Sequence, residues 1–325
     1  MTAMGKSEGQ QAAQRDLVIG VDVGGTTIKA ASLDDAGLEY GRSERPTPRH
    51  LGPDVVVEAA IQAIAELRAQ LPEGARLRGV GLVIPGIVDA QEGIAVYAAN
   101  LGWRELPVRQ IVAKAVDLPV VLDHDVRAAG LAELELGAAR GLQEVLFVAL
   151  GTGIAAAVIT RGQISAGATG RAGELGHLPV FPEGERCACG QRGCTETYAS
   201  AAALSRRYSA VSGMDSVPAK DVISRAATGD SVAAEVFNDA VTALGRALVN
   251  YTLLLDPELI LIGGGLAAAG APLLDPLTRE VQAGLTWRPA PMISTGRFGG
   301  DAGSRGAAIL AWRAVQGMQA LGTTY

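Results

Sequence analysis

Two apolar stretches of the chain are each interrupted by a glycine-rich break. Residues 17–33 are apolar on both sides of Gly24-Gly25, and residues 145–159 repeat this order around Gly151-Thr152-Gly153. Short apolar runs that end at glycine are typical of buried strands joined by tight turns. The pattern therefore predicts a strand–turn–strand unit in each of two duplicated halves.

Other segments show helical or short-strand patterns. Apolar residues recur at helical spacing after Asp54, a predicted N-cap, and again over residues 231–255 and 304–318. Residues 77–84 and 259–262 are short apolar runs that end in Pro-Gly or in glycines, which indicates buried strands. Alternating strands and helices favour an α/β fold with mixed sheets.

Composition and charge limit the class of protein. The 325 residues suffice for two domains, 48% of them are apolar, and the net charge of -6 disfavours a nucleic-acid surface. The longest uncharged apolar run, 145–160, is too short to cross a bilayer. Residues 1–16 are polar and lack the apolar region of a signal peptide, so we expect a disordered leader. We expect a cytoplasmic protein with no membrane or nucleic-acid partner.

The first glycine turn carries groups suited to a phosphate. Two glycines allow a close backbone approach, hydroxyls add hydrogen-bond donors, and a carboxylate at the strand end can hold Mg²⁺ through water. These residues are Asp22, Gly24, Gly25, Thr26, Thr27 and Lys29. A single turn of this kind is more often an ordinary hairpin with solvated ends.

Two further glycine loops change that balance towards phosphate binding. Gly151, Thr152 and Gly153 repeat the first turn in the second half of the chain, and Gly263, Gly264 and Gly265 follow a buried strand. We expect the three loops to bind a nucleotide. The sequence contains neither the G-x-x-x-x-G-K-[ST] motif of P-loop proteins nor a G-x-G-x-x-G dinucleotide motif after a strand.

All the cysteines lie in one short segment. His177, Cys187, Cys189 and Cys194 offer one imidazole and three thiolates, a donor set typical of tetrahedral structural zinc. Gly190 and Gly193 allow the tight turns that such a cluster needs. Three free thiols near a solvated histidine are the alternative, and the crowding of every cysteine into one segment favours zinc.

Four motifs together resemble the repressor–ORF–kinase (ROK) family and, within it, the bacterial glucokinases. The resemblance covers nearly all of the chain from Leu17 onward. The motifs are residues 22–29 (DVGGTTIK), 151–153 (GTG), 173–177 (GELGH) and 187–196 (CACGQRGCTE).

The resemblance implies an actin-like ATPase or ribonuclease-H-like duplicated α/β fold, with two domains around a cleft. The small domain would span residues 17–122 and be completed by a C-terminal helix over 304–325. The large domain would span 123–303 and hold the zinc loop. Similar proteins are commonly dimers or tetramers, so a homo-oligomer is expected.

The resemblance also implies the residues of the sugar site. Asp125 corresponds to the base that accepts the proton of the sugar 6-hydroxyl, and it would bind the sugar together with Asn100, Glu174, His177 and Glu196. One ring nitrogen of His177 would bind zinc and the other would face the sugar. The family usually has asparagine where this chain has His124 and Arg127.

The expected activity is ATP-dependent phosphorylation of glucose to glucose 6-phosphate, with Mg²⁺ accompanying ATP and Zn²⁺ in a structural role. Mannose, fructose, allose or an N-acetylhexosamine remains open as the acceptor, and polyphosphate as the donor. Alanines at 155–157 replace glycines that the family often has there. A sugar-sensing regulator is the alternative from another class. Family repressors carry an N-terminal helix-turn-helix domain, for which residues 1–16 are too few.

Overall fold

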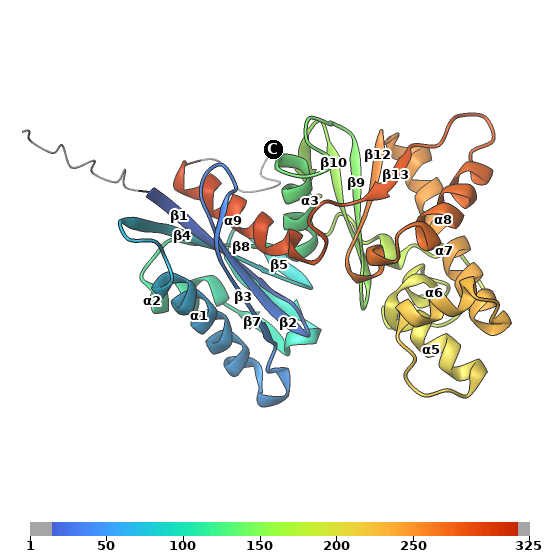
Figure 1. Ribbon diagram of the computed structural model, residues 1–325, viewed down its shortest axis with the longest axis horizontal. Coiled ribbons are helices and arrows are strands. Elements are labelled where there is room, and N and C mark those ends of the chain that lie inside the picture. Colours follow the sequence, from blue (N-terminus) through green and yellow to red (C-terminus); the bar gives the residue numbers. More distant parts are fainter. Residues whose placement is uncertain (1–14, 318–325) are drawn as a thin grey trace, which may run out of the picture.

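The computed structural model describes residues 15–317 (Figure 1). Residues 1–14 of the expected leader lie outside this range. Arg15 and Asp16, which we expected to be disordered, instead begin the first strand, β1 (Arg15–Val23), and they pair with Ala75 and Arg76 of β4.

The first sheet has five strands in the order β3-β2-β1-β4-β8. The antiparallel β1–β2 pair is the predicted strand–turn–strand unit, whereas β4 and β8 run parallel to β1. β8 includes Asp123 and His124, so this sheet extends two residues past the expected boundary at 122. The remaining strands are β2 (Thr27–Leu33), β3 (Glu39–Pro46), β4 (Ala75–Ile84) and β8 (Val120–His124).

The second sheet repeats this topology. Its order is β11-β10-β9-β12-β13, with β9–β10 and β10–β11 antiparallel and β12 and β13 parallel to β9. The predicted duplication is therefore confirmed strand by strand. The strands are β9 (Val145–Leu150), β10 (Ile154–Thr160), β11 (Gln163–Ser165), β12 (Leu259–Gly263) and β13 (Met292–Thr295).

Two helices lie between the sheets. α9 (Ala302–Val315) packs on β1 and β4, α3 (Asp125–Glu135) packs on β10, and the two helices pack against each other (Figure 1). The backbone contact of α9 is so close that a Cβ atom at Gly81 would lie 1.8 Å from the carbonyl oxygen of Ala307. The expected C-terminal helix thus begins at residue 302 and ends at 315, and residues 318–325 lie outside the described range.

The outer faces of both sheets are covered by the remaining helices (Figure 1). α1 and α2 share a hydrophobic core with the first sheet, and α4 to α8 share one with the second. α1 begins after Gly52 and not after an Asp54 cap, so Asp54 lies in the first turn. The ranges are α1 (Pro53–Ala69), α2 (Val108–Val116), α4 (Glu196–Ala199), α5 (Ala201–Ser212), α6 (Ala219–Ala227), α7 (Ser231–Leu255) and α8 (Ala271–Gly284).

A third, small sheet was not expected from the sequence. Its strands are β5 (Ile87–Asp89), β6 (Ile94–Ala98) and β7 (Trp103–Leu106), and the short helix η2 (Ala99–Leu101) joins the last two. Trp103 is 2% exposed, and its indole Nε1 donates to the carbonyl oxygen of Pro53, which fixes the small sheet against the start of α1.

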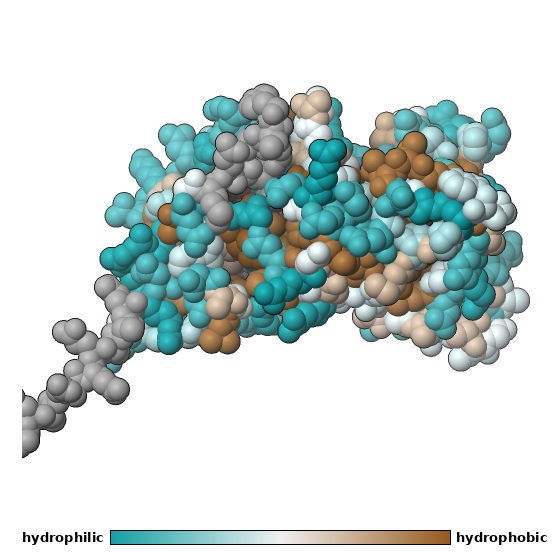
Figure 2. All heavy atoms as spheres, turned by 90° about the horizontal axis from the view of Figure 1, so that it is seen from above, coloured by the Kyte–Doolittle hydropathy of each residue, from teal (hydrophilic) through white to brown (hydrophobic). Residues whose placement is uncertain are grey.

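The surface of the molecule is mixed in polarity. Figure 2 shows hydrophilic residues over much of the face seen from above, with hydrophobic residues gathered in smaller patches. Among residues 15–317, no helix is both long enough and apolar enough to span a bilayer.

Candidate active site

The carboxyl ends of parallel strands meet at one edge of each sheet. In the first sheet, the Gly24-Gly25 turn follows β1, Gly86 lies just past β4, and Asp125 follows β8 directly. Ligands of open α/β sheets bind outside the carboxyl ends of the strands. The topology therefore gathers the predicted phosphate turn and the predicted base at the same edge.

The first glycine turn is held by a residue that sequence analysis missed. The Thr47 hydroxyl donates to the Gly24 carbonyl oxygen over 2.6 Å, and its amide donates to the Thr26 carbonyl oxygen over 2.9 Å. The Gly24 amide also donates to Thr27 over 3.0 Å. Thr47 follows the third strand, and no local pattern marks it as a partner of a turn more than twenty residues away.

Asn100 lies directly against this turn. A Cβ atom placed on Gly25 would lie 3.0 Å from the Asn100 Cβ, so the glycine leaves room for the amide side chain. η2 presents Asn100 on an exposed segment. A predicted sugar ligand and a predicted phosphate loop, 75 residues apart in the sequence, are therefore neighbours.

Asp22 lies close enough to Asp125 for the charge of that carboxylate to affect its ionisation. Burial, and to a lesser extent the Asp125 carboxylate, raise the pKa of Asp22 to about 8, while the Lys29 ammonium opposes the shift. Gly303, at the start of α9, makes room for this carboxylate, because a Cβ there would lie 2.2 Å from Asp22 Oδ2. Small residues such as Gly303 in the C-terminal helix indicate that another segment packs closely against it. Nothing in the sequence indicated that this segment contains Asp22.

The raised pKa of Asp22 predicts a pH-dependent stability. The unfolded chain ionises Asp22 near its ordinary pKa of 3.8, whereas the folded protein keeps the proton until about pH 8. The contribution of Asp22 to the free energy of unfolding is therefore fully present below pH 3.8 and is lost as the pH rises towards about 8. Asp22→Asn removes this loss, so without nucleotide its Tm should exceed that of the wild type at pH 7.5 and match it near pH 4. An equal Tm difference at both pH values would contradict the assignment.

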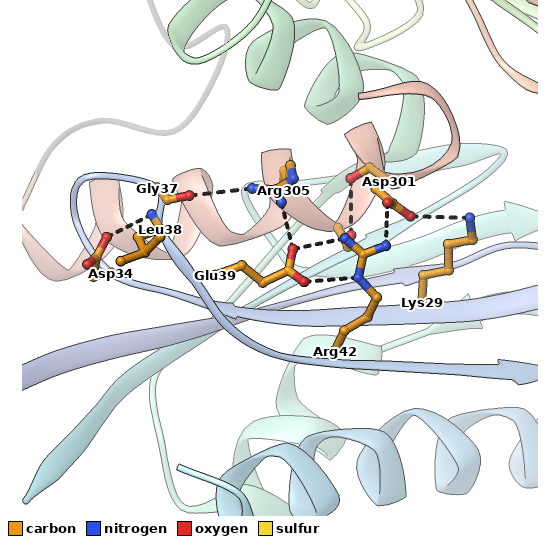
Figure 3. Close-up of polar contacts among 9 residues, drawn as sticks. Lys29, Asp34, Gly37, Leu38, Glu39, Arg42, Asp301 and Arg305 are labelled. Atoms are coloured by element: carbon orange, nitrogen blue, oxygen red, sulfur yellow. Dashed lines mark hydrogen bonds and ion pairs between the residues drawn. The ribbon is translucent and has the colours of Figure 1, made fainter. Parts of the chain in front are cut away.

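Lys29 takes part in an ionic cluster between β2, β3 and the segment that enters α9 (Figure 3). Its ammonium donates to the Gly300 carbonyl oxygen over 3.0 Å and lies 3.4 Å from Asp301. Arg42 bridges Asp301 and Glu39, at 2.6 Å and 3.0 Å. The cluster therefore fastens β2 and β3 to the segment that enters α9, and Lys29 contributes to that contact.

Asp125 is the first residue of α3 and is partly exposed. Its Oδ1 accepts from the Val126 amide over 2.7 Å and lies 3.2 Å from His124 Nδ1. His124 is the N-cap of the helix, where its Nδ1 also accepts from the Val126 amide, over 3.2 Å. The Asp125 carboxylate is therefore fixed at the N-terminus of α3, at the carboxyl edge of the first sheet.

The two glycine loops of the second half lie at the carboxyl edge of the second sheet. Gly151 donates its amide to the Gly153 carbonyl oxygen over 3.0 Å after β9, and the other loop follows β12, the parallel neighbour of β9. Gly264 has a φ angle of 78°, and a Cβ there would lie 2.5 Å from the Leu150 carbonyl oxygen. Only glycine fits this contact, so the two loops adjoin.

Glu196 is bound to the start of β10. Its Oε2 accepts from the Ile154 amide over 2.8 Å, and a Cβ on Gly153 would lie 2.6 Å from the same oxygen. The predicted sugar ligand Glu196 and the predicted phosphate loop at Gly151–Gly153 are thus brought together across 42 residues of sequence.

A small hollow is lined by residues of both halves of the chain. The first half contributes residues after β4 and β8, and the second contributes β10 and the loop before the GELGH motif. The lining residues are Gly86, Ile87, His124, Arg127, Ala155, Ala156, Gly170, Arg171, Ala172, Gly173 and Glu174. Glu174 and the segment that carries Asp125 therefore border the same space.

The four predicted zinc ligands converge in the structure. Their ligand atoms all lie within 4.8 Å of one another, with Cys187 Sγ 3.6 Å from His177 Nδ1 and Cys189 Sγ 3.6 Å from Cys194 Sγ. Zn–S bonds of about 2.3 Å in a tetrahedron separate two sulfurs by about 3.8 Å. The donor set and the spacing therefore fit zinc. Burial raises the pKa of the Cys194 thiol to about 12 in the metal-free site, so zinc binding must displace its proton.

His177 is oriented for two contacts. Its Nδ1 faces the thiol cluster, whereas its Nε2 lies 3.9 Å from Glu174 Oε2. Gly193, with a φ angle of 68°, allows the Cys187–Cys194 turn to pass so close to Phe181 that no side chain would fit. The predicted zinc cluster thus includes one predicted sugar ligand, His177, and adjoins another, Glu174.

Comparison with known proteins agrees with this geometry. Residues 18–314 match the model of the ROK family. The glucokinase of Halalkalibacterium halodurans is 36% identical over 82% of this chain and 85% of its own length, and that of Streptomyces coelicolor is 32% identical over 91% and 97%.

The structure is also similar to that of a ROK family glucokinase from Streptomyces griseus in complex with glucose and AMPPNP. The TM-score is 0.79 at 34% sequence identity, over 91% of this chain and 99% of that one. The predicted actin-like duplicated fold is thereby confirmed. With the family match covering almost all of the described residues, the chain belongs to the ROK family.

Proposed function

We infer that this protein is a ROK-type glucokinase, which transfers the γ-phosphoryl group of ATP to the 6-hydroxyl of glucose. The observation that carries this is the placement of Asp125 at the sheet edge, beside Asp22 and next to His124, which lines a hollow together with Glu174. Phosphoryl transfer to an alcohol needs a base at the hydroxyl and a positively polarised cradle for the phosphates. The similar S. griseus enzyme is described with glucose and AMPPNP bound.

We assign the sugar contacts to both sides of the hollow. Asn100 and Asp125 belong to the first half, and Glu174, His177 and Glu196 belong to the second. Carboxylates and an amide at fixed positions can each accept or donate to vicinal hydroxyls, and a site built this way discriminates strongly against analogues that lack one. Asp125 would then take the proton of the 6-hydroxyl.

We assign the phosphate contacts to the three glycine loops. Backbone amides and threonine hydroxyls of residues 24–27 and 151–153 suit the phosphates, and residues 263–265 suit the nucleoside. Asp22 would hold Mg²⁺ through water, and the ion neutralises charge on the phosphates. Lys29, engaged with Asp301, would contribute by fixing β2 and through its longer-range charge.

We assign zinc to His177, Cys187, Cys189 and Cys194, where it would be a structural ion. The metal would hold the imidazole in one orientation, so that Nε2 is aimed at the sugar next to Glu174. Because Glu196 follows Cys194 by two residues, the same ion would set the position of a second sugar ligand.

A coupled ADP-release assay against several hexoses tests this function. Turnover should be highest with glucose among glucose, mannose, fructose, allose and N-acetylmannosamine. Formation of glucose 6-phosphate, followed with a dehydrogenase because polyphosphate releases no ADP, should be faster with ATP than with polyphosphate. Preference for another hexose would keep the chemistry but change the substrate. Binding of a sugar without any turnover would favour a sensing role instead.

We further propose a homo-oligomer that works in the cytoplasm, where ATP is available. Exposed apolar side chains support self-association: Leu254, Trp287 and Met292 are 81%, 77% and 63% exposed. Light scattering of the purified protein measures the number of subunits, and a monomer at micromolar concentration would contradict the proposal.

A further inference from the structure

Arg127 is a buried cation next to the proposed base. It is 4% exposed, and it reaches from the first turn of α3 back to the end of β8. Its Nε and Nη2 both donate to Asp123 Oδ1, over 2.8 Å and 2.5 Å, and Asp123 is itself 2% exposed. Asp125 lies between these two residues in the chain. The ion pair therefore links the two ends of the short segment that contains Asp125.

The remaining terminal nitrogen of Arg127 makes a different contact. Its Nη1 donates to the carbonyl oxygen of Gly170 over 2.8 Å, across 43 residues of sequence. Gly170 belongs to the loop between β11 and the GELGH motif. The guanidinium thereby bonds to the first sheet on one side and to a loop of the second half on the other.

The loop that Arg127 contacts leads directly to Glu174. It is fixed at its far end by Gly173, whose carbonyl oxygen accepts from the Ala156 amide of β10 over 2.7 Å. The Glu174 side chain is half exposed, and its Oε2 lies 3.9 Å from His177 Nε2. The position of Glu174 therefore depends on how the 166–173 loop is held.

We propose that Arg127 is a positioning residue, which sets the Glu174 loop relative to Asp125 through the Asp123–Arg127–Gly170 contacts. The proposal rests on the proposed function, because it takes Asp125 and Glu174 as sugar ligands. Its consequence is that Asp125 and Glu174 are held in fixed positions relative to each other before the sugar binds.

The chemistry of arginine explains why it stands here. A planar guanidinium can donate from three nitrogens in fixed directions, whereas the asparagine usual in the family at this place has one amide nitrogen on a short side chain. A buried ion pair by itself adds little net stability, because desolvation offsets the attraction. The third bond, to Gly170, is what joins the pair to the sugar site.

Arg127→Lys tests the proposal while leaving a cation beside buried Asp123. A lysine can bond to Asp123 but cannot also reach Gly170 with a second nitrogen, so one charge-assisted hydrogen bond is lost. We expect the KM for glucose to rise about tenfold while the KM for ATP changes by less than about twofold. A purely structural role would instead lower the active fraction, which reduces kcat and leaves both KM values unchanged.

Two further variants make the result decisive. Arg313→Lys is the matched control, because Arg313 pairs with Glu135 at the other end of α3, and it should leave both KM values unchanged. The double variant Asp123→Asn with Arg127→Met removes both buried charges together and so avoids an unpaired one. It should show the same selective rise in the glucose KM as Arg127→Lys. A folded variant of either kind with an unchanged glucose KM would overturn the proposal.

Hydrogen exchange separates this proposal from the proposed function. Amides of residues 166–174 should exchange about tenfold faster in Arg127→Lys than in the wild type, with α7 unchanged. Absence of hexose turnover in the wild type would refute the kinase assignment and, with it, the glucose part of this proposal. Unchanged exchange in the loop would refute the Gly170 contact alone.

Discussion

Replacing Asp125 by asparagine is expected to lower kcat for glucose by about 10³-fold, since general-base catalysis by a placed side chain contributes about 10²–10⁴-fold. An amide can still accept from the Val126 amide, as Oδ1 of Asp125 does over 2.7 Å, so the turn at the start of α3 should persist. It cannot take up a proton. Glucose affinity, measured by calorimetry without nucleotide, should therefore change by less than about threefold.

Asp117→Asn is the matched control for this experiment. Asp117 is the left-handed C-cap of α2, with a φ angle of 55°, where asparagine is well tolerated. The control variant should turn over like the wild type. High turnover in Asp125→Asn would remove Asp125 from the role of base and leave Asp22, its close neighbour, as the next carboxylate to test.

Removing zinc is expected to raise the KM for glucose by about 10–100-fold, the range typical of lost metal-site orientation. Without the ion, His177 Nε2 is no longer fixed beside Glu174, and the turn that leads from Cys194 to Glu196 is free to move. Cys194→Ser should reproduce the effect, because this fully buried thiol loses its place in the tetrahedron. The KM for ATP should change far less, since the glycine loops at 24–27 and 263–265 lie on segments that do not include the cluster.

The zinc experiment needs its own controls. Metal content is measured alongside the kinetics, and adding zinc back should restore glucose affinity to the chelated wild type but not to Cys194→Ser. Far-ultraviolet circular dichroism checks that α7 and the sheets remain folded. A zinc-free, folded protein with unchanged glucose affinity would contradict the proposed link between the metal and the sugar site.

Local patterns predicted the parts of the fold that depend on neighbours in sequence. Apolar runs cut by glycine identified the β1–β2 and β9–β10 units, and the helix expected over residues 231–255 is α7 with the same bounds. The Asp54 cap was wrong because Gly52, with a φ angle of 108°, ends the preceding turn and Pro53 starts the helix. The third sheet escaped prediction because its strands are only three to five residues long.

The sequence named candidate site residues but not the contacts that bring them together. The four proposed metal ligands stood out because thiols crowd into one segment, and the structure brings their ligand atoms together. Arg127 was visible only as a departure from the family pattern, since nothing in the sequence indicates that it reaches Gly170. Thr47 carries no signal at all, because its role depends on the register of β3 beside the first glycine turn.

The most direct test of the account is to identify the product formed from glucose and Mg-ATP by ³¹P and ¹³C nuclear magnetic resonance. The account predicts glucose 6-phosphate and ADP in equal amounts, with phosphorus coupled to carbon 6, and no phosphorylated sugar with Asp125→Asn on the same timescale. Hydrolysis of ATP without a phosphorylated sugar, or phosphate on a hydroxyl other than the one at carbon 6, would contradict it.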